Sequence, residues 1–222
     1  MSIPSHYVRV VYFYPADYTT DQRYLDAVDP FVQDIRSWYR EKTGKTFYAR
    51  SVEVIRGQKN AEEYSIPTAW APDGAAWANV YAELGIDCNA NTSIVTLVFL
   101  ARTLQHANGR TCAPIGTWYN PVYNGDVTVS EANFDAEIAG ACPGVALENY
   151  WWDCNQATKR RAVAHELGHA FSLSHPDCSL TVDGRSYCDL TIMWSWWNLD
   201  AGFIDEPTAP EMSTLLASPW FH

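Results

Sequence analysis

The amino-acid sequence predicts an α+β fold, in which helices pack on a twisted mixed sheet and a small C-terminal lobe follows. Three strand-like segments alternate with two helix-like segments over the first part of the chain. This alternation implies right-handed crossovers and a sheet covered by helices. A stretch rich in Gly, Asn and Pro then breaks the rhythm, and a helix-like segment that carries histidines comes after it.

The strand-like segments are rich in β-branched and aromatic residues, which favour strands. Pro15 ends the first of them, and Arg56-Gly57 ends the second. The third is apolar on both faces, which is typical of a central strand. These segments are Tyr7–Tyr14, Thr46–Ile55 and Ser93–Ala101.

Two helix-like segments separate these strands. The first can begin after a cap at Thr20 or Asp21 and continues to about Lys42, with apolar residues three or four positions apart. Pro30 lies inside it and can kink it or split it in two. Gly44 suits the position just after its end. The second helix is expected over Asp73–Leu84.

Shorter elements are expected in the rest of the chain. We expect edge strands around Ile115–Tyr119 and Asp126–Val129, with loops above a cleft. The remaining expectations are a helix over Asn155–Phe171, a loop over Pro176–Asp189 and a last helix over Pro207–Ala217. No linker marks a second domain, so residues 1–222 are expected to form one domain, with an upper lobe of about residues 1–175 and a lower lobe of about residues 176–222.

Charge and composition argue against two classes of partner. The formal net charge is −11, whereas nucleic acids and anionic membrane surfaces bind basic proteins. No apolar run is long enough to cross a bilayer, and the first residues do not resemble a signal peptide. We expect a secreted monomer, with its signal peptide absent from this sequence and with neither nucleic-acid partners nor membrane insertion.

The even number of cysteines, six, predicts three disulfides and an oxidising compartment. None of them forms a Cys-x-x-Cys pair, which argues against a zinc-ribbon or redox motif. Six cysteines allow 15 pairings, and the alternative is a set of buried free thiols in a cytosolic protein. The pairing that we favour joins neighbours in sequence: Cys88 with Cys112, Cys142 with Cys154, and Cys178 with Cys188.

Residues 165–177 contain the pattern His-Glu-x-x-His, with a third histidine six residues further on. A helix places His165 and His169 on one face. If the helix ends soon after His169, His175 can turn back to the same point. Three imidazoles with an open fourth position form a catalytic zinc site, and Glu166 can reach a water there but is badly placed as a ligand. The alternative is that these histidines fall at this spacing by chance, but the composition of the chain makes such a chance pattern rare.

This pattern resembles that of the metzincins, a clan of zinc endopeptidases with H-E-x-x-H-x-x-G-x-x-H and a later tight turn that carries methionine beneath the metal. Thr191-Ile192-Met193 resembles that Met-turn, so Met193 is the candidate residue beneath the metal; the alternative is an ordinary core methionine. The resemblance is specific over Ala164–Trp194 and concerns only the order of elements elsewhere. The residues that match the motif are His165, Glu166, His169 and His175.

The resemblance implies a metzincin-like fold with an active-site helix, and a zinc-dependent endopeptidase that hydrolyses peptide bonds through a zinc-activated water. Glu166 would act as general base and then protonate the leaving amine. A peptide substrate would lie extended along an edge strand, for which Ile115–Tyr119 is the candidate. Trp194, Trp196 and Trp197 would shape a pocket or fill the lower core.

Two residues depart from the clan pattern. Ser172 occupies the position of a glycine that leaves the helix in a left-handed conformation, at a cost of roughly 1 kcal/mol for serine. Ser195 occupies the position of a tyrosine that some members have two residues after the methionine. Calcium is a second candidate ion, through Asp177, Asp183 and Asp189, but these acids lack the spacing of a calcium loop and surface acids are the simpler interpretation.

Two other functions compete with an active endopeptidase. One is a catalytically weak, protease-like binding or adhesion module that retains the zinc site, which Ser172 favours and Glu166 opposes. The other is a zinc enzyme whose third ligand is a downstream acid such as Glu206, with His175 merely nearby. The position of His175 and the presence of Met193 argue against it.

Overall fold

The computed structural model describes the larger part of the chain. The described residues are 4–20, 22–64, 75–86, 93–100, 108–111, 125–130, 163–165, 167–179, 181–182, 184–186, 188, 191, 193 and 209–222. Among them, no helix has the length and apolar composition needed to cross a membrane.

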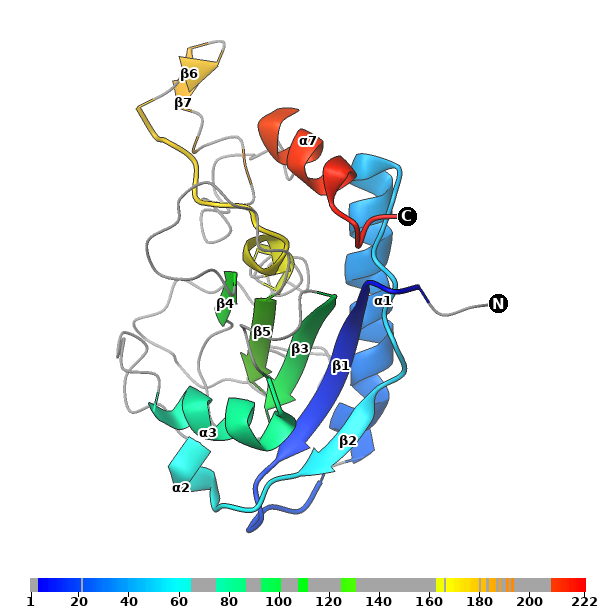
Figure 1. Cartoon of the computed structure of the whole chain (residues 1–222), viewed down its shortest axis with the longest axis vertical. Coiled ribbons are helices and arrows are strands. Elements are labelled where there is room, and N and C mark those ends of the chain that lie inside the picture. The colour runs from blue at the N-terminus through cyan, green and yellow to red at the C-terminus, as the bar shows by residue number, and fades with distance from the viewer. Residues whose placement is uncertain are drawn as a thin grey trace.

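A five-stranded mixed sheet forms the centre of the fold, with helices packed on it (Figure 1). The strand order is β2-β1-β3-β5-β4. Four of the strands are parallel, and β4 runs antiparallel to β5 at one edge. The strands are β1 (Tyr7–Tyr14), β2 (Glu53–Arg56), β3 (Ile94–Leu100), β4 (Asn108–Thr111) and β5 (Gly125–Ser130).

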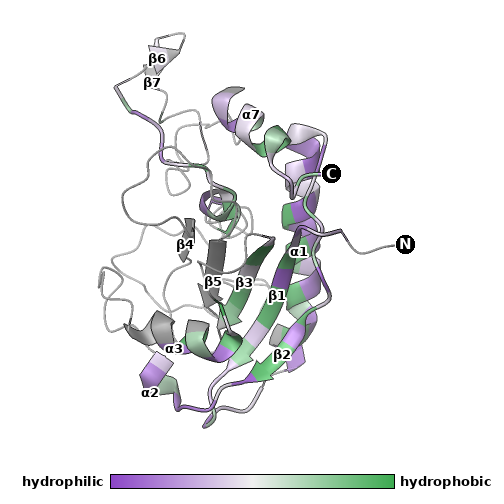
Figure 2. Ribbon diagram, in the orientation of Figure 1, coloured by the Kyte–Doolittle hydropathy of each residue, from purple (hydrophilic) through white to green (hydrophobic). Residues whose placement is uncertain are grey.

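Helix α1 (Gln22–Thr43) is continuous through Pro30, so neither a split nor a break occurs there. Gly44 follows it with φ of 74°, and its amide donates to the carbonyl of Arg40 at 2.9 Å. This left-handed ending is the one for which glycine is suited. Along α1, hydrophobic and hydrophilic residues alternate with the turn of the helix (Figure 2), as expected of a helix with one buried face.

The two faces of the sheet carry two separate cores. Alternate residues of β1 point to opposite faces, as they must in a strand. Val8, Val10 and Tyr12 join the larger core with α1, whereas Val11 and Phe13 join the smaller core. The smaller core is completed by buried residues of two short helices, α2 (Ala61–Tyr64) and α3 (Ala75–Leu84).

The larger core also holds the residues around the histidine motif. Residues 163–165 and 167–170 are helical, and we call them the histidine helix. Its buried side chains pack with α1 and with α7 (Ala209–Ala217) on the same face of the sheet. In the sequence, a small hairpin of β6 (Thr181–Val182) and β7 (Arg185–Ser186) comes between the histidine helix and α7. It projects at the top of Figure 1.

An aromatic cluster joins α1, the histidine helix and the segment around Phe221. Tyr39 lies at its centre, with ring centroids at 5.3 Å from Phe221, 5.8 Å from Phe47 and 6.0 Å from Phe171. Trp220 completes it at 6.3 Å from Phe171. The main chain supports this contact, because Phe47 forms a β-bridge with Phe221.

Two sequence expectations about strands were wrong. Thr46–Ile55 is not one strand: only β2 is regular, and Phe47 and Ala49 form isolated bridges. Asp126–Val129 lies in β5, which is an inner parallel strand and not an edge strand, because β4 pairs on its outer side. Strand β4 itself and α2 were not expected. The expected strand at Ile115–Tyr119 and the start of the expected helix at Asn155 lie outside the described residues.

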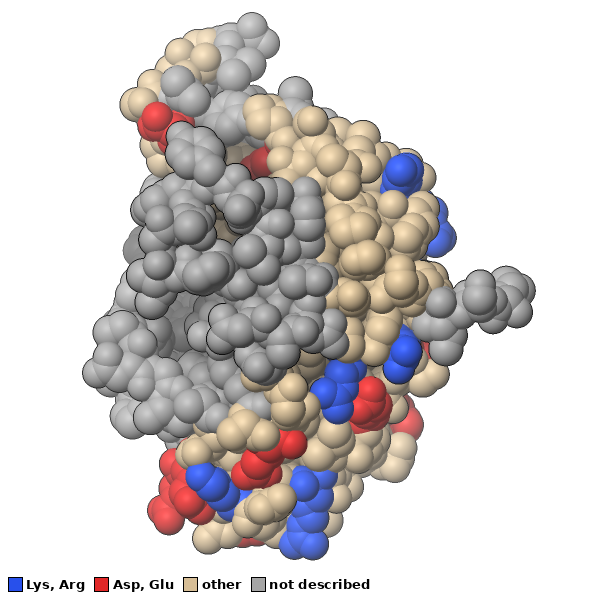
Figure 3. Space-filling model, viewed as in Figure 1, with Lys and Arg blue, Asp and Glu red and all other residues tan. Residues whose placement is uncertain are grey.

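The described surface carries mixed charge on the face that Figure 3 shows, where acidic and basic side chains lie close together at the lower end. One pair is Arg9 with Glu53, whose Nη2 and Oε2 atoms are 2.8 Å apart. Arg9 also donates to the carbonyl of Leu84 at 2.9 Å. This arginine therefore ties β1, β2 and the end of α3 together.

Candidate metal centre

The three histidines of the motif converge on one point. Their Nε2 atoms are separated by 3.1 Å between His165 and His169, 3.0 Å between His169 and His175, and 3.4 Å between His165 and His175. Within the described part of the chain, these three side chains form a group that could hold a metal ion.

The spacing of the three nitrogens fits a tetrahedral ion. Zinc–nitrogen bonds of about 2.0–2.1 Å at tetrahedral angles place two nitrogen donors about 3.3 Å apart. The observed separations, 3.0 to 3.4 Å, bracket that value. Imidazole nitrogens also suit zinc, copper, iron and nickel better than calcium or magnesium. The donors therefore fit a transition metal, and their geometry fits zinc.

A hydrogen bond fixes which nitrogen of His169 is available. Its Nδ1 lies 2.9 Å from the carbonyl oxygen of Leu173. A carbonyl can only accept, so Nδ1 carries the proton and Nε2 presents its lone pair. Metal-binding histidines commonly have their other nitrogen held in this way.

The surroundings of His169 and His175 favour their neutral form, which is the form that binds metals. Burial lowers the pKa of His169 to about 4, with a smaller lowering by His175, against the opposing effect of the Leu173 carbonyl. Burial also lowers the pKa of His175. His165 is buried, His169 is half-buried and His175 is exposed, so solvent reaches the group from the side of His175.

The turn after the histidine helix brings His175 back to the group. The amide of Ser172 donates to the carbonyl of His169 at 2.9 Å, and that of Leu173 donates to the carbonyl of Gly168 at 2.9 Å. This pair of bonds is a Schellman ending, which requires a left-handed residue between helix and exit. Ser172 is that residue, with φ of 76°. Serine thus makes the turn that the sequence pattern assigns to glycine.

Helix α1 holds the other side of the histidine helix. The hydroxyl of Tyr39 donates to the carbonyl of Ala164 at 2.8 Å, in a buried position next to His165. Burial raises the pKa of Tyr39, so its hydroxyl keeps the proton that this bond needs. Together with the aromatic cluster, this bond fixes the helix against the core.

Met193 packs directly against the histidine helix. It is completely buried, and a Cβ atom added to Gly168 would collide with its sulfur atom. Gly168 lies one residue before His169, so the absence of a side chain there lets the methionine approach the metal-binding turn of the helix. The position suits the predicted Met-turn, and that role remains a prediction.

Two buried polar residues connect Met193 to the last helix, and the sequence reasoning missed both. The amide of Met193 donates to Oγ1 of Thr191 at 3.0 Å, and the Thr191 hydroxyl donates to Oε1 of Glu211. Both residues are buried. A signal was present, because Glu211 lies four residues before the apolar Leu215 and therefore shares its face of the last helix.

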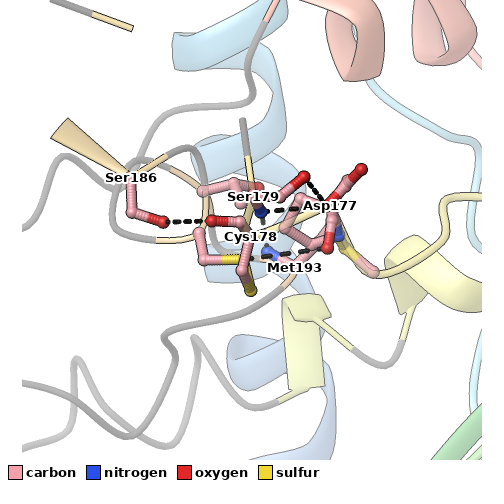
Figure 4. The surroundings of a disulfide bond; sticks show 8 residues. Asp177, Cys178, Ser179, Ser186 and Met193 are labelled. Carbon is pink, nitrogen blue, oxygen red and sulfur yellow. Dashed lines mark hydrogen bonds between the residues drawn. A yellow bond between two sulfur atoms is a disulfide. The ribbon is translucent and has the colours of Figure 1, made fainter. Parts of the chain in front are cut away.

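A disulfide closes the loop after the third histidine, as the sequence predicted. Cys178 and Cys188 are joined, with a Cα–Cα distance of 5.0 Å. The bond encloses the β6–β7 hairpin, and Ser186 of β7 donates to the carbonyl of Cys178 at 3.2 Å. Met193 lies among the residues around this disulfide (Figure 4). The disulfide therefore stiffens the segment next to His175.

Asp177 is engaged within its own loop. Its Oδ1 accepts from the amide and the hydroxyl of Ser179, at 2.9 and 2.7 Å. These bonds lower the pKa of its carboxyl group. Asp183 and Asp189, its expected partners in a calcium site, lie outside the described residues.

Several predicted residues also lie outside the described part of the chain. They are Glu166, the alternative ligand Glu206, Ser195, the tryptophans at 194, 196 and 197, and the cysteines at 88, 112, 142 and 154. Their roles stay predictions from sequence.

Comparison with known proteins gives a likeness in fold. No family model matches the sequence, and no curated protein matches it. Among solved structures, wild-type OgpA from Akkermansia muciniphila is similar over the whole of this chain, with a TM-score of 0.59 and 15% identity. The match covers 63% of that OgpA chain, so the present chain spans less than two thirds of its length.

Other OgpA crystal structures match over shorter stretches. A second form of the wild-type protein has a TM-score of 0.50 and 14% identity, and covers 79% of this chain and 50% of that one. Catalytically inactive OgpA in complex with an O-glycopeptide (glycodrosocin) substrate has a TM-score of 0.48 and 13% identity, with the same coverage. The match with a TM-score of 0.59 shows a likeness in fold to OgpA, and at 15% identity it shows the fold alone.

Proposed function

We propose that the chain is a zinc-dependent endopeptidase of the metzincin type. The observation that carries this proposal is the convergence of three Nε2 atoms at 3.0 to 3.4 Å. The packing of Met193 against the same helix supports it. His165, His169 and His175 would hold the ion, which supplies Lewis-acid polarisation and a water of lowered pKa, about 7.

Glu166 is the proposed general base. Its place in the sequence, directly after His165, puts it one position round the helix from the ligands. There it would take the proton of the attacking water and pass it to the leaving amine. The support for this role is the sequence pattern, and the test is the Glu166 variant described below.

Strand β4 is the proposed docking edge for an extended peptide. Among the described strands it is the last in the hydrogen-bonding order of the sheet, and peptides commonly add to such edges through main-chain bonds. This proposal moves the edge from Ile115–Tyr119 to Asn108–Thr111. The sheet edge would orient the peptide while the histidine group supplies the chemistry.

Ser172 no longer favours a weakened binding module over an enzyme. Its left-handed φ and the two bonds of the Schellman ending provide the same chain reversal as glycine. The geometry also supports His175 as third ligand in preference to Glu206, because its Nε2 already lies 3.0 Å from that of His169.

The proposal also includes the compartment, the domain organisation and the substrates of the enzyme. The disulfide between Cys178 and Cys188 supports an oxidising compartment and hence secretion. We also propose that residues 1–222 form one catalytic domain, that it works as a monomer, and that its substrates are proteins or peptides.

The first experiment measures metal content together with peptide cleavage. We expect about one zinc per chain, and cleavage by the wild-type protein of some members of a peptide library that includes O-glycosylated peptides. Glu166→Gln is expected to retain zinc and lose at least about a hundredfold in kcat, in line with the loss of a general base. His6→Ala, a histidine outside the motif, is the matched control and is expected to retain both properties.

Two outcomes would contradict the proposal. A zinc-loaded wild-type protein that cleaves nothing in the library would favour the binding module. A His175→Ala variant that binds zinc as tightly as the wild type would remove His175 from the ligand set.

A further inference from the structure

Thr191 forms a buried hydrogen-bond relay between the last helix and Met193. Its hydroxyl donates to Oε1 of Glu211, and its Oγ1 accepts from the amide of Met193 at 3.0 Å. A hydroxyl has one proton, so donation to the carboxylate leaves its lone pairs for the amide. The backbone amide of Met193 can only donate, so it fixes the direction of its own bond, and the single hydroxyl proton of Thr191 goes to Glu211.

Burial makes this relay difficult to replace. Thr191 is 2% exposed, Glu211 is 7% exposed and Met193 is fully buried. Bulk water therefore has little access to any of the three groups, and an unpaired buried donor or acceptor is costly. Bonds to a charged acceptor are also stronger than neutral ones, and they polarise the next bond in the chain.

The relay ends where precise placement is required. The methionine sulfur lies against Gly168, where even a methyl group would collide with it. Gly168 lies between two histidines of the group, and its carbonyl accepts the bond from Leu173 that shapes the exit toward His175. A shift of Met193 would consequently move the turn of helix that carries His169.

We propose that Glu211 is a positioning residue for the metal centre. Acting through Thr191, it sets the distance between Met193 and the histidine helix, and thereby the spacing of the three imidazoles. The link to metal binding rests on the proposed function, whereas the placement of Met193 can be tested in the metal-free protein.

The experiment uses the three methionines of the chain as reporters. Metal-free protein labelled with ¹³C in the methionine methyl groups should give one resonance for each, and Met193→Leu identifies that of Met193. Met212 lies next to Glu211 in α7 and reports on the packing of that helix. Zinc affinity is measured on the same samples by competition with a chelator.

Four variants separate positioning from general stability. Thr191→Val and Glu211→Leu each break the relay, and each is expected to lower the melting temperature. Thr191→Ser keeps the hydroxyl and should restore the wild-type Met193 resonance. The double variant Thr191→Val/Glu211→Leu removes the hydroxyl and the carboxyl group together but leaves the Met193 amide unpaired, so its melting temperature should recover only in part.

The double variant decides the question. We expect its Met193 resonance to remain displaced while that of Met212 returns, and its zinc affinity to be about 10- to 100-fold below that of the wild type. A double variant with wild-type Met193 resonance and zinc affinity would overturn the proposal, because Glu211 would then only stabilise α7. If wild-type protein binds no zinc, the proposed function fails, but the Met193 resonance still decides whether Glu211 positions that residue.

Discussion

Met193 occupies the space that a side chain on residue 168 would need. The collision would be with its sulfur atom, and the methyl carbon of Met193 and Cδ1 of Leu173 would lie only 3.2 and 3.3 Å from the same Cβ. Two residues from distant parts of the chain are therefore complementary in size. This relationship predicts that Gly168 and Met193 are energetically coupled. The coupling can be tested by enlarging residue 168 while shortening residue 193.

Gly168→Ala is expected to destabilise the protein by about 1–3 kcal/mol through overpacking, and Met193→Ala by about 2–5 kcal/mol through a cavity. The double variant should cost clearly less than the sum, because the added methyl group enters the vacated space. Urea denaturation of the four proteins measures the coupling. Additive effects would show that the two residues are not in contact.

Ser172→Gly is expected to stabilise the protein by about 1 kcal/mol, because glycine adopts a left-handed conformation without the strain of a side chain. For a chain of this size, that corresponds to a rise in melting temperature of about 2–4 °C. Ser174→Gly is the matched control, since Ser174 has no positive φ and glycine there should be neutral or destabilising. Calorimetry distinguishes the two; equal effects would contradict the role assigned to the turn.

The metal-free protein should lose stability as the pH falls from about 6.5 towards 4. The pKa of His169 is about 4 in the folded protein and about 6.5 when unfolded. The unfolded state therefore binds more protons in that interval, and stability rises with pH until both states are neutral. The slope for this residue is at most about 1.4 kcal/mol per pH unit.

Denaturation curves of the metal-free protein between pH 4 and pH 8 would measure this slope. His169→Asn removes the titrating group and is expected to flatten it. With saturating zinc, the stability of the protein should fall more steeply as the pH is lowered, because protons then compete with the metal for the same nitrogens. A metal-free wild type whose stability is constant over the interval would contradict the burial of His169.

Replacement of both Cys178 and Cys188 by serine should lower the free energy of unfolding by about 2–3 kcal/mol, from the freedom gained by a short loop. We also expect weaker zinc binding, because the loop that follows His175 loses its closure. Melting curves and zinc competition assays measure the two effects. Unchanged zinc affinity in a folded double variant would show that the loop does not support His175.

Much of the architecture could be predicted from local sequence patterns that show which residues are buried. The apolar and β-branched runs predicted β1 and β3, and the three-four spacing predicted α1. The neighbouring positions of Cys178 and Cys188 predicted their disulfide. In each case, the signal is local, since the residues that form the element are also those that reveal it.

Elements that depend on distant partners were missed or misjudged. Strand β4 has the sequence Asn-Gly-Arg-Thr, with no apolar pattern, and is a strand because its main chain pairs with β5. Phe47 was placed in a long strand, yet its partner is Phe221 at the far end of the chain. Of the candidate site, spacing predicted the three histidines and the resemblance to a Met-turn predicted Met193, whereas the relay to Glu211 depends on tertiary packing.

The bridge between Phe47 and Phe221 has a consequence for folding during translation. Translation produces Tyr39 and Phe47 long before Trp220 and Phe221, which lie more than 170 residues later in the sequence. Until then, the central rings lack two of their partners and stay exposed, in the way that invites association between incomplete chains. The nascent polypeptide therefore completes this core only after Phe221 has been made, and binding of a metal ion by the histidines is expected to follow that step.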